Sequence, residues 1–254
     1  MSLPTHAARS WIQRWDRQQE HYLPDREDRF AVIADIVVLT AERLDKPDPV
    51  VLDIGCGPGS LSARVRQRLP LARVIGVDGD PLLLGIAAAN YPWLELVDTD
   101  LRTPQWTDAL PVSEVDVVVS TTALHWLQHD ELAALYAELA GVIRPGGVFV
   151  NGDWMPITAH GELLGRLSVD LRDQLARRAG VAGREEDWEA WWAAVNRAPE
   201  LAELAAIREQ RPLAHHEDGG VDFDEQARLL RELGFAEVGP LWQFGPDRIL
   251  VGVR

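Results

Sequence analysis

The residues best suited to chemistry lie in a glycine-rich stretch, Asp53-Ile54-Gly55-Cys56-Gly57-Pro58-Gly59, which follows a short apolar run. The apolar run predicts a buried strand and the pattern from Ser60 onward predicts a helix, so the glycines form the turn between them. Glycines at alternate positions permit positive φ and let the backbone approach a ligand, because no Cβ stands in the way. The turn leads to a helix N-terminus, which favours an anionic group, and Asp53 adds a charge suited to a hydroxyl or an ammonium. The stretch therefore suits a ligand that carries both a carboxylate and an amine.

Acidic residues also follow the next two predicted strands. Asp78 lies about 20 residues beyond the glycine-rich turn, the spacing at which a carboxylate can reach a ribose diol. The alternative for Asp78 is a helix cap before Pro81. Asp98 and Asp100 follow the third strand, where either could accept a hydrogen bond from an exocyclic adenine amine, and we favour Asp100.

A histidine follows the fourth predicted strand. His125 would lie at the carboxyl edge of the sheet, where open α/β folds bind their ligands. Its ordinary pKa of about 6.5 suits proton removal from a hydroxyl or an amine. The alternative is that His125 bonds a neighbouring carbonyl and orders its loop.

These residues are positioned by strands and helices that alternate along the chain. Strands are predicted over residues 50–53, 73–78, 94–98, 115–120 and 148–151, and then over 235–241 and 248–253, which the turn 245–247 joins. Helices are predicted over residues 60–69, 81–90, 130–143 and 222–233. The alternation implies right-handed crossovers and a mostly parallel sheet, which is an α/β fold.

Two further helical patterns, over residues 7–20 and 25–44, precede the first strand. One interpretation is a pair of packing helices with a solvated face. The other is a lid, formed by residues 1–46, that brings Tyr22 and Arg26 to the substrate. Residues 47–254 are then the main domain.

A helical insertion of about residues 154–220 follows the fifth strand, with patterns near 161–179, 185–196 and 199–210. An insertion at this edge of a sheet shapes the substrate pocket in many α/β proteins. Trp188, Trp191 and Trp192 have helical spacing, which indicates either core packing or an aromatic substrate wall. Trp106 is likewise a core residue or the edge of an adenine slot, with the core favoured.

Composition limits the classes of partner. The chain has 254 residues and a net charge of −15, which argues against nucleic acid and anionic membranes and favours a small-molecule substrate. The single cysteine excludes an internal disulfide, and we expect a cytoplasmic protein because we find neither a signal peptide nor a membrane span. The segment His215-His216-Glu217-Asp218 invites a metal interpretation, but neighbouring histidines in an unpatterned loop rarely form a site without further ligands, and no metal is predicted. The oligomeric state is left open.

The motifs together resemble those of class I S-adenosylmethionine-dependent methyltransferases. The resemblance covers residues 50–152 and is carried by the glycine-rich stretch, Gly76-Val77-Asp78, Asp100, 120–127 and Arg144-Pro145-Gly146-Gly147. The run Ala123-Leu124-His125-Trp126-Leu127 is similar to the trans-aconitate methyltransferase group. The resemblance implies a Rossmann-like sheet of seven strands with the last strand antiparallel.

The resemblance also implies S-adenosylmethionine as the cofactor. The expected cofactor contacts are Asp53, Gly55, Cys56, Gly57, Gly59, Asp78, Gly79, Asp100, Leu101, Ser120 and Thr121. The glycines would hold the methionine moiety, Asp78 the ribose, and Asp100 with Leu101 the adenine. The expected substrate contacts are Tyr22, Arg26, Trp126 and Trp154, with His125 as the catalytic residue nearest the transferring methyl.

The predicted function is methyl transfer to a small molecule, with oxygen of a carboxylate or hydroxyl as the favoured acceptor. Nitrogen or carbon acceptors are alternatives. A nicotinamide-dependent oxidoreductase is another, although its fingerprint is G-x-G-x-x-G and the spacing here is G-x-G-x-G. A non-catalytic S-adenosylmethionine-binding subunit is disfavoured, because every expected cofactor motif is present.

Overall fold

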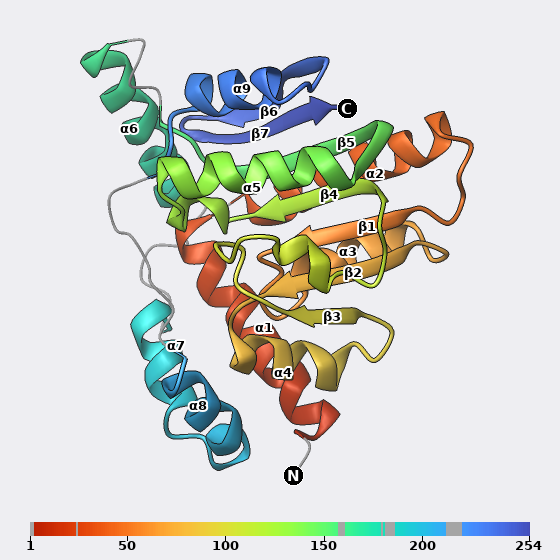
Figure 1. The fold of residues 1–254 in the computed structure, drawn as a ribbon. Coiled ribbons are helices and arrows are strands. Elements are labelled where there is room, and N and C mark those ends of the chain that lie inside the picture. The colour runs from red at the N-terminus through yellow and green to blue at the C-terminus, as the bar shows by residue number, and fades with distance from the viewer. Residues whose placement is uncertain (1–2, 24, 157–160, 179, 181–185, 212–219) are drawn as a thin grey trace.

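A seven-stranded sheet forms the centre of the computed structural model, in the order β3-β2-β1-β4-β5-β7-β6 (Figure 1). The structure describes residues 3–23, 25–156, 161–178, 180, 186–211 and 220–254. The strands are β1 (Val50–Ile54), β2 (Arg73–Asp78), β3 (Glu95–Asp98), β4 (Val115–Thr121), β5 (Ile143–Trp154), β6 (Glu237–Phe244) and β7 (Asp247–Val253). Strands β1 to β5 pair in parallel, whereas β7 lies antiparallel between β5 and β6. The predicted mostly parallel sheet with an antiparallel last strand is confirmed.

Helices cover both faces of this sheet. They are α1 (Thr5–Tyr22), α2 (Arg26–Arg43), α3 (Ser60–Arg68), α4 (Pro81–Asn90), α5 (His129–Val142), α6 (Glu162–Arg178), α7 (Trp188–Val195), α8 (Ala202–Glu209) and α9 (Phe223–Glu232). Three short 3-10 turns, at Trp106–Ala109, Leu124–Trp126 and Pro199–Leu201, lie in the connections. The described helices of the insertion, α6 to α8, agree with the predicted patterns.

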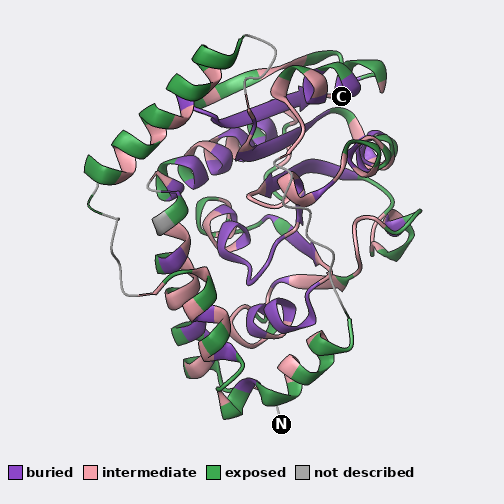
Figure 2. Cartoon of the chain, turned by 90° about the vertical axis from the view of Figure 1, so that its left-hand side faces the viewer, coloured by how far each residue is buried: buried purple, intermediate pink, exposed green. Residues whose placement is uncertain are grey.

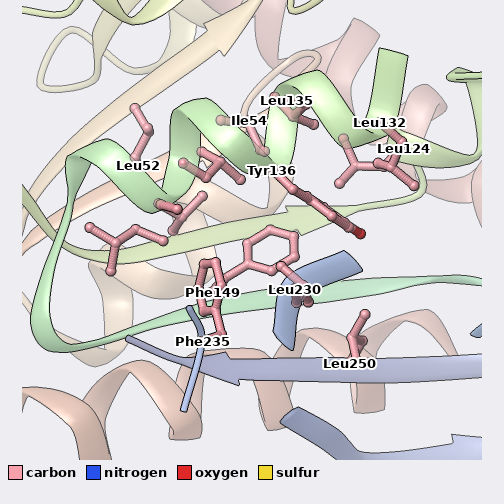
Figure 3. Packing of buried hydrophobic residues seen from close by; sticks show 14 of the residues in the cluster. Leu52, Ile54, Leu124, Leu132, Leu135, Tyr136, Phe149, Leu230, Phe235 and Leu250 are labelled. Carbon is pink, nitrogen blue, oxygen red and sulfur yellow. The ribbon is translucent and has the colours of Figure 1, made fainter. Parts of the chain in front are cut away.

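The alternation of side chains along β1 shows how the two faces are built. Leu52 and Ile54 point into a cluster with residues of α5 and α9, such as Tyr136 and Leu230 (Figure 3). Val51 points to the opposite face, into a cluster with α2 and α3 that includes Phe30. Because both faces are covered, the central strands are buried and read as continuous apolar runs (Figure 2).

A third apolar cluster lies beside the sheet and joins α1, α4 and α7. Trp11 of α1 and Trp191 of α7 are buried there, with ring centroids 5.8 Å apart. Gly85 of α4 lets α8 approach closely, since a Cβ at that position would lie 2.6 Å from the side chain of Leu204. Helix α1 thus packs outside the sheet layers, while α2 belongs to one of them (Figure 1).

Two strands differ from the sequence expectation by more than one residue at both ends. Strand β5 begins at Ile143 rather than 148, because the chain there continues to pair with β4 across a register shift. Gly146 supplies a φ of 79° at this irregularity. Strand β6 spans Glu237–Phe244 rather than 235–241, because Phe235 is instead buried against α5 and α9.

Candidate active site

A cavity of about 620 Å³ opens at the carboxyl ends of the parallel strands. Its walls come from the glycine-rich turn, the ends of β2, β4 and β5, the C-terminal end of α1, and the insertion helices α6 to α8. In Figure 1 the arrowheads of β1 to β4 point toward the side on which α6, α7 and α8 lie. The insertion therefore forms part of the cavity, as the sequence predicts.

The glycine-rich turn has the conformation that its glycines permit. Gly55, Gly57 and Gly59 have φ values of 66°, 52° and 85°, in the left-handed region that other residues rarely adopt. Gly55 also has no room for a side chain, because a Cβ there would lie 2.4 Å from that of Ala123. Gly55 and Gly57 line the cavity, whereas Gly59 lies behind it as the N-cap of α3.

Asp78 ties the tip of β2 to this turn. Its carboxylate accepts hydrogen bonds from the backbone N–H groups of Gly57 and Asp80, each at 2.8 Å. Burial raises the pKa of Asp78 to about 6, although those hydrogen bonds oppose the shift. The helix-cap alternative for Asp78 is wrong, because Asp80 caps α4 by accepting from the backbone of Leu82 and Leu83. Asp78 and Gly79 line the cavity.

Asp53 lies deeper, at the end of β1. It is 1% exposed and accepts a hydrogen bond of 2.5 Å from the hydroxyl of Ser62. Burial raises the pKa of Asp53 to about 7, so the negative charge of this side chain is reduced near neutral pH. The fixed negative charge expected here is therefore conditional on pH.

Some of the residues at the end of β3 and after it line the cavity and others do not. Asp100 and Leu101 line the cavity, and Asp100 is paired with Arg102 at 2.7 Å. The Arg102 hydrogen bonds lower the pKa of Asp100. Asp98 pairs with Arg211 and does not line the cavity, and Trp106 is a buried core residue, as favoured.

His125 forms a pair with Asp153, which the sequence analysis did not single out. The Nδ1 atom of His125 lies 2.7 Å from Oδ1 of Asp153, and the His125 backbone N–H donates to Oδ2 at 3.0 Å. Burial opposes the charged imidazole, but the adjacent Asp153 carboxylate outweighs it and raises the pKa of His125. The partner is thus a carboxylate rather than the carbonyl of the alternative interpretation. The available signal was the place of Asp153 at the end of a buried strand.

The other predicted residues divide in the same way. Thr121 and Cys56 line the cavity, whereas Ser120 is buried and donates its hydroxyl to the carbonyl of Ile54 at 2.8 Å. The predicted substrate contacts also line the cavity: Tyr22, Arg26, Trp126 and Trp154.

The insertion contributes residues that the sequence did not mark. Arg172 of α6 and Arg208 of α8 line the cavity, and their positions depend on how distant helices pack. Trp188 and Trp192 line it as well, while Trp191 is a core residue.

Comparison with known proteins places the central segment in a family. A family model described as a methyltransferase domain matches residues 51–147. This segment is a class I S-adenosylmethionine-dependent methyltransferase domain. It contains the glycine-rich turn, Asp78, Asp100 and His125, and it confirms the resemblance found in the sequence.

Curated relatives of the methyltransferase domain share about half of their length with this chain. The trans-aconitate 2-methyltransferase of Azoarcus sp. (strain BH72) is 38% identical over 134 residues, which are 53% of this chain and 48% of the relative. The enzyme of the same name from Escherichia coli (strain ATCC 8739) is 31% identical over 140 residues, which are 55% of this chain and 45% of the relative.

Solved structures show the same fold at low sequence identity. A putative S-adenosylmethionine-dependent methyltransferase from Methanococcus maripaludis is 15% identical, with a TM-score of 0.53 over all of this chain and 94% of that one. Human N-acetylserotonin methyltransferase in complex with S-adenosylmethionine is 14% identical, with a TM-score of 0.51. The match covers 82% of this chain and 48% of that one. These likenesses concern the fold.

None of the described helices has the length and hydrophobicity to cross a membrane. Among the described residues, no group of three or more His, Cys, Asp or Glu side chains could hold a metal ion. The segment 215–218 lies outside the described residues.

Proposed function

We propose that this protein transfers the methyl group of S-adenosylmethionine to an oxygen of a small-molecule acceptor. The observation that carries the proposal is the His125–Asp153 pair in the same cavity as the glycine-rich turn and Asp78. The names of the curated relatives, trans-aconitate 2-methyltransferases, support oxygen over nitrogen or carbon.

The cavity residues fit this cofactor. The left-handed glycines leave a backbone surface that a Cβ would obstruct, and Asp78 offers a carboxylate to a ribose diol at the tip of β2. Gly55 and Gly57 would hold the amino-acid moiety, Asp78 the ribose, and Asp100 with Leu101 the base. When bound, the cofactor supplies an electrophilic methyl group on a positively charged sulfur.

The pair formed by His125 and Asp153 would handle the acceptor's proton. With Nδ1 bonded to Asp153, Nε2 is the ring atom able to take a proton from an acceptor hydroxyl. The acceptor oxygen would form a bond to the methyl carbon as the carbon–sulfur bond breaks, and the electron pair of the broken bond would stay on sulfur. Asp153 acts as a positioning residue, because it holds the imidazole and stabilises its charged form.

The lining of the cavity would also keep water away from the reacting atoms. Tyr22 from the end of α1 and Trp188 from α7 meet at its rim, where the Trp188 backbone N–H donates to the Tyr22 hydroxyl at 3.3 Å. We propose that, within residues 1–46, the C-terminal end of α1 serves as the lid, because α2 packs in a layer of the sheet. The acidic composition supports a small-molecule substrate rather than nucleic acid or an anionic membrane.

The test is binding and turnover with the full chain. Titration calorimetry should show binding of S-adenosylhomocysteine and no binding of NAD. Incubation with S-adenosylmethionine and a library of hydroxyl and carboxylate compounds should release S-adenosylhomocysteine with at least one acceptor. Binding of NAD alone would favour the oxidoreductase alternative, and binding of S-adenosylhomocysteine with no turnover on any acceptor would favour the non-catalytic subunit.

A further inference from the structure

The arginines that line the cavity are committed to carboxylates of the protein itself. Among the described residues, the cavity has four arginines, and each forms an ion pair: Arg26 with Asp16 at 2.9 Å, Arg102 with Asp100 at 2.7 Å, Arg172 with Asp247 at 3.0 Å, and Arg208 with Asp80 at 2.6 Å. An incoming polyanion would have to compete with these carboxylates for the guanidinium groups. Breaking such partly buried pairs leaves an uncompensated charge, which is costly.

Three of these arginines also lie over aromatic rings: Arg26 over Phe30, 4.4 Å from the ring centroid, and Arg172 and Arg208 over tryptophans. The guanidinium carbon of Arg172 lies 4.8 Å from the ring centroid of Trp154, and that of Arg208 lies 3.9 Å from the centroid of Trp192. Each guanidinium is therefore held by a carboxylate and by a ring face at once. Reorienting any of these arginines toward a ligand would lose both contacts.

The acids of the lining outnumber its arginines. Seven described carboxyl side chains line the cavity: Asp53, Asp78, Asp80, Asp100, Asp153, Glu189 and Asp247. Asp53 and Asp78 carry a reduced charge near neutral pH, because burial raises the pKa of both. The remaining acids still balance or exceed the arginines, so the lining offers no net attraction to an anionic acceptor.

Aromatic side chains occupy the part of the lining near His125 and the insertion. The ring centroids of His125 and Trp126 are 4.7 Å apart, and Trp154 follows Asp153 directly. The ring centroids of Trp188 and Trp15 are 5.4 Å apart, and both side chains line the cavity. These flat apolar surfaces offer stacking to a planar ring.

We infer that the acceptor is an uncharged planar aromatic compound with a hydroxyl group, rather than a polycarboxylate such as trans-aconitate. This rests on the proposed function and names its substrate class. The ring would stack on Trp154 or Trp188 of the lining, with its hydroxyl directed toward His125. The chain therefore differs in acceptor from what the names of its curated relatives state.

The experiment measures binding of two probes to the full chain saturated with S-adenosylhomocysteine. Titration calorimetry is done with 2-naphthol, an uncharged aromatic alcohol, and with trans-aconitate. We expect 2-naphthol to bind at least tenfold more tightly. Trp154→Ala and Trp188→Ala should each weaken 2-naphthol binding by about 2- to 12-fold. Affinity for S-adenosylhomocysteine should stay within about twofold. Trp154→Phe and Trp188→Phe, which keep a ring, should retain most of the 2-naphthol affinity.

Trp93→Ala removes a tryptophan that packs on Tyr91 outside the cavity lining and should leave both probes unaffected. Tighter binding of trans-aconitate, or no binding of 2-naphthol by a chain that does bind S-adenosylhomocysteine, would overturn the inference. Failure to bind S-adenosylhomocysteine would instead overturn the proposed function.

Discussion

The chemistry of individual residues in the cavity depends on partners that lie far away in the sequence. His125 and Asp153 are separated by 28 positions but meet because β4 and β5 are neighbours in the sheet. The pair raises the pKa of His125, so the neutral imidazole needed for proton removal prevails only above that raised value. The catalytic rate is therefore expected to fall as pH drops through it.

Replacing the positioning residue should move this pH dependence. Asp153→Asn removes the charge that favours the imidazolium, so the acidic limb of the profile of kcat against pH should shift to lower pH. Turnover should also fall by about 10- to 100-fold, because the ring is less well oriented. Steady-state kinetics between pH 5 and 9 checks both effects.

The control for this experiment is Glu225→Gln, since Glu225 forms a similar pair with exposed His129 at 2.6 Å, away from the cavity. It should change neither the limb nor the rate. An unshifted limb in Asp153→Asn would show that His125 does not set the profile.

Removing the imidazole itself should affect chemistry and spare cofactor binding. We expect His125→Ala to lower kcat by about 10²- to 10⁴-fold if the acceptor is a hydroxyl. Calorimetry should give an unchanged affinity for S-adenosylhomocysteine. If kcat is retained and KM for the acceptor rises instead, the acceptor is an anion that His125 merely orients.

Asp78 should contribute to cofactor affinity. Asp78→Ala removes a carboxylate that also holds Gly57, and we expect S-adenosylhomocysteine affinity to fall by about 1–3 kcal/mol. Asp98→Ala is the matched control, since Asp98 ends the adjacent strand but does not line the cavity. Equal affinities in both variants would remove Asp78 from the cofactor site.

Most residues on the cofactor side of the cavity could be predicted from the sequence, because they lie in or directly after recognisable strands. The glycine-rich turn and Asp78 belong to a strand-turn-helix pattern and to the strand that follows it, and His125 follows a recognisable strand. Asp153 could have been named by the same strand-end argument. Ser120 was misplaced, since the side-chain period of two decides which strand-end residue faces the cavity, and here Thr121 does.

At the scale of elements, the cavity is closed by helices from opposite parts of the chain. Helix α1 and the insertion helix α7 share the aromatic contacts of Trp15 with Trp188 and Trp191. Helix α8 is fixed to α4 by the close approach at Gly85 and by the pair of Arg208 with Asp80. The sequence predicted these helices but could not place them, since their apolar faces do not specify which partner they cover.

The lid proposal makes a prediction about hydrogen exchange. If the end of α1 closes over the ligand, adding S-adenosylhomocysteine should slow amide exchange in residues 15–22 and in α7. Helix α9, which packs on β6 and β7 away from the cavity, should be unchanged. Equal exchange in α1 with and without ligand would support the packing-helix interpretation.

At the scale of the whole molecule, the buried acids of the cavity affect stability. The folded-state pKa of Asp53, about 7, lies above the unfolded value, so the folded ligand-free protein holds a proton that the unfolded chain releases. Asp78, with a pKa of about 6, acts in the same direction. Their contribution therefore destabilises the fold progressively as pH rises from about 4 to about 7, and remains constant above that.

A variant isolates this contribution. Asp53→Asn keeps an acceptor for the Ser62 hydroxyl but does not titrate, so it should lose less stability than the wild type between pH 5 and pH 8. The difference is about 3 kcal/mol, from about 1.4 kcal/mol per pH unit over the roughly two units between pH 5 and the Asp53 pKa of about 7. Urea unfolding at both pH values measures it. A wild type and a variant with parallel pH dependence would contradict the burial effect.

The position of β7 between β5 and β6 has a consequence for biosynthesis. Strands β1 to β4 can pair with one another as they leave the ribosome, but β5 keeps one edge unpaired until residues 247–253 have been made. Arg29, which is fully buried in the folded protein, likewise has no ion-pair partner at position 247 until Asp247 has been made. During that interval the nascent chain presents a row of free backbone groups and an uncompensated charge. The interval just before β7 is added is thus the stage at which the edge of β5 is open to pairing with another chain.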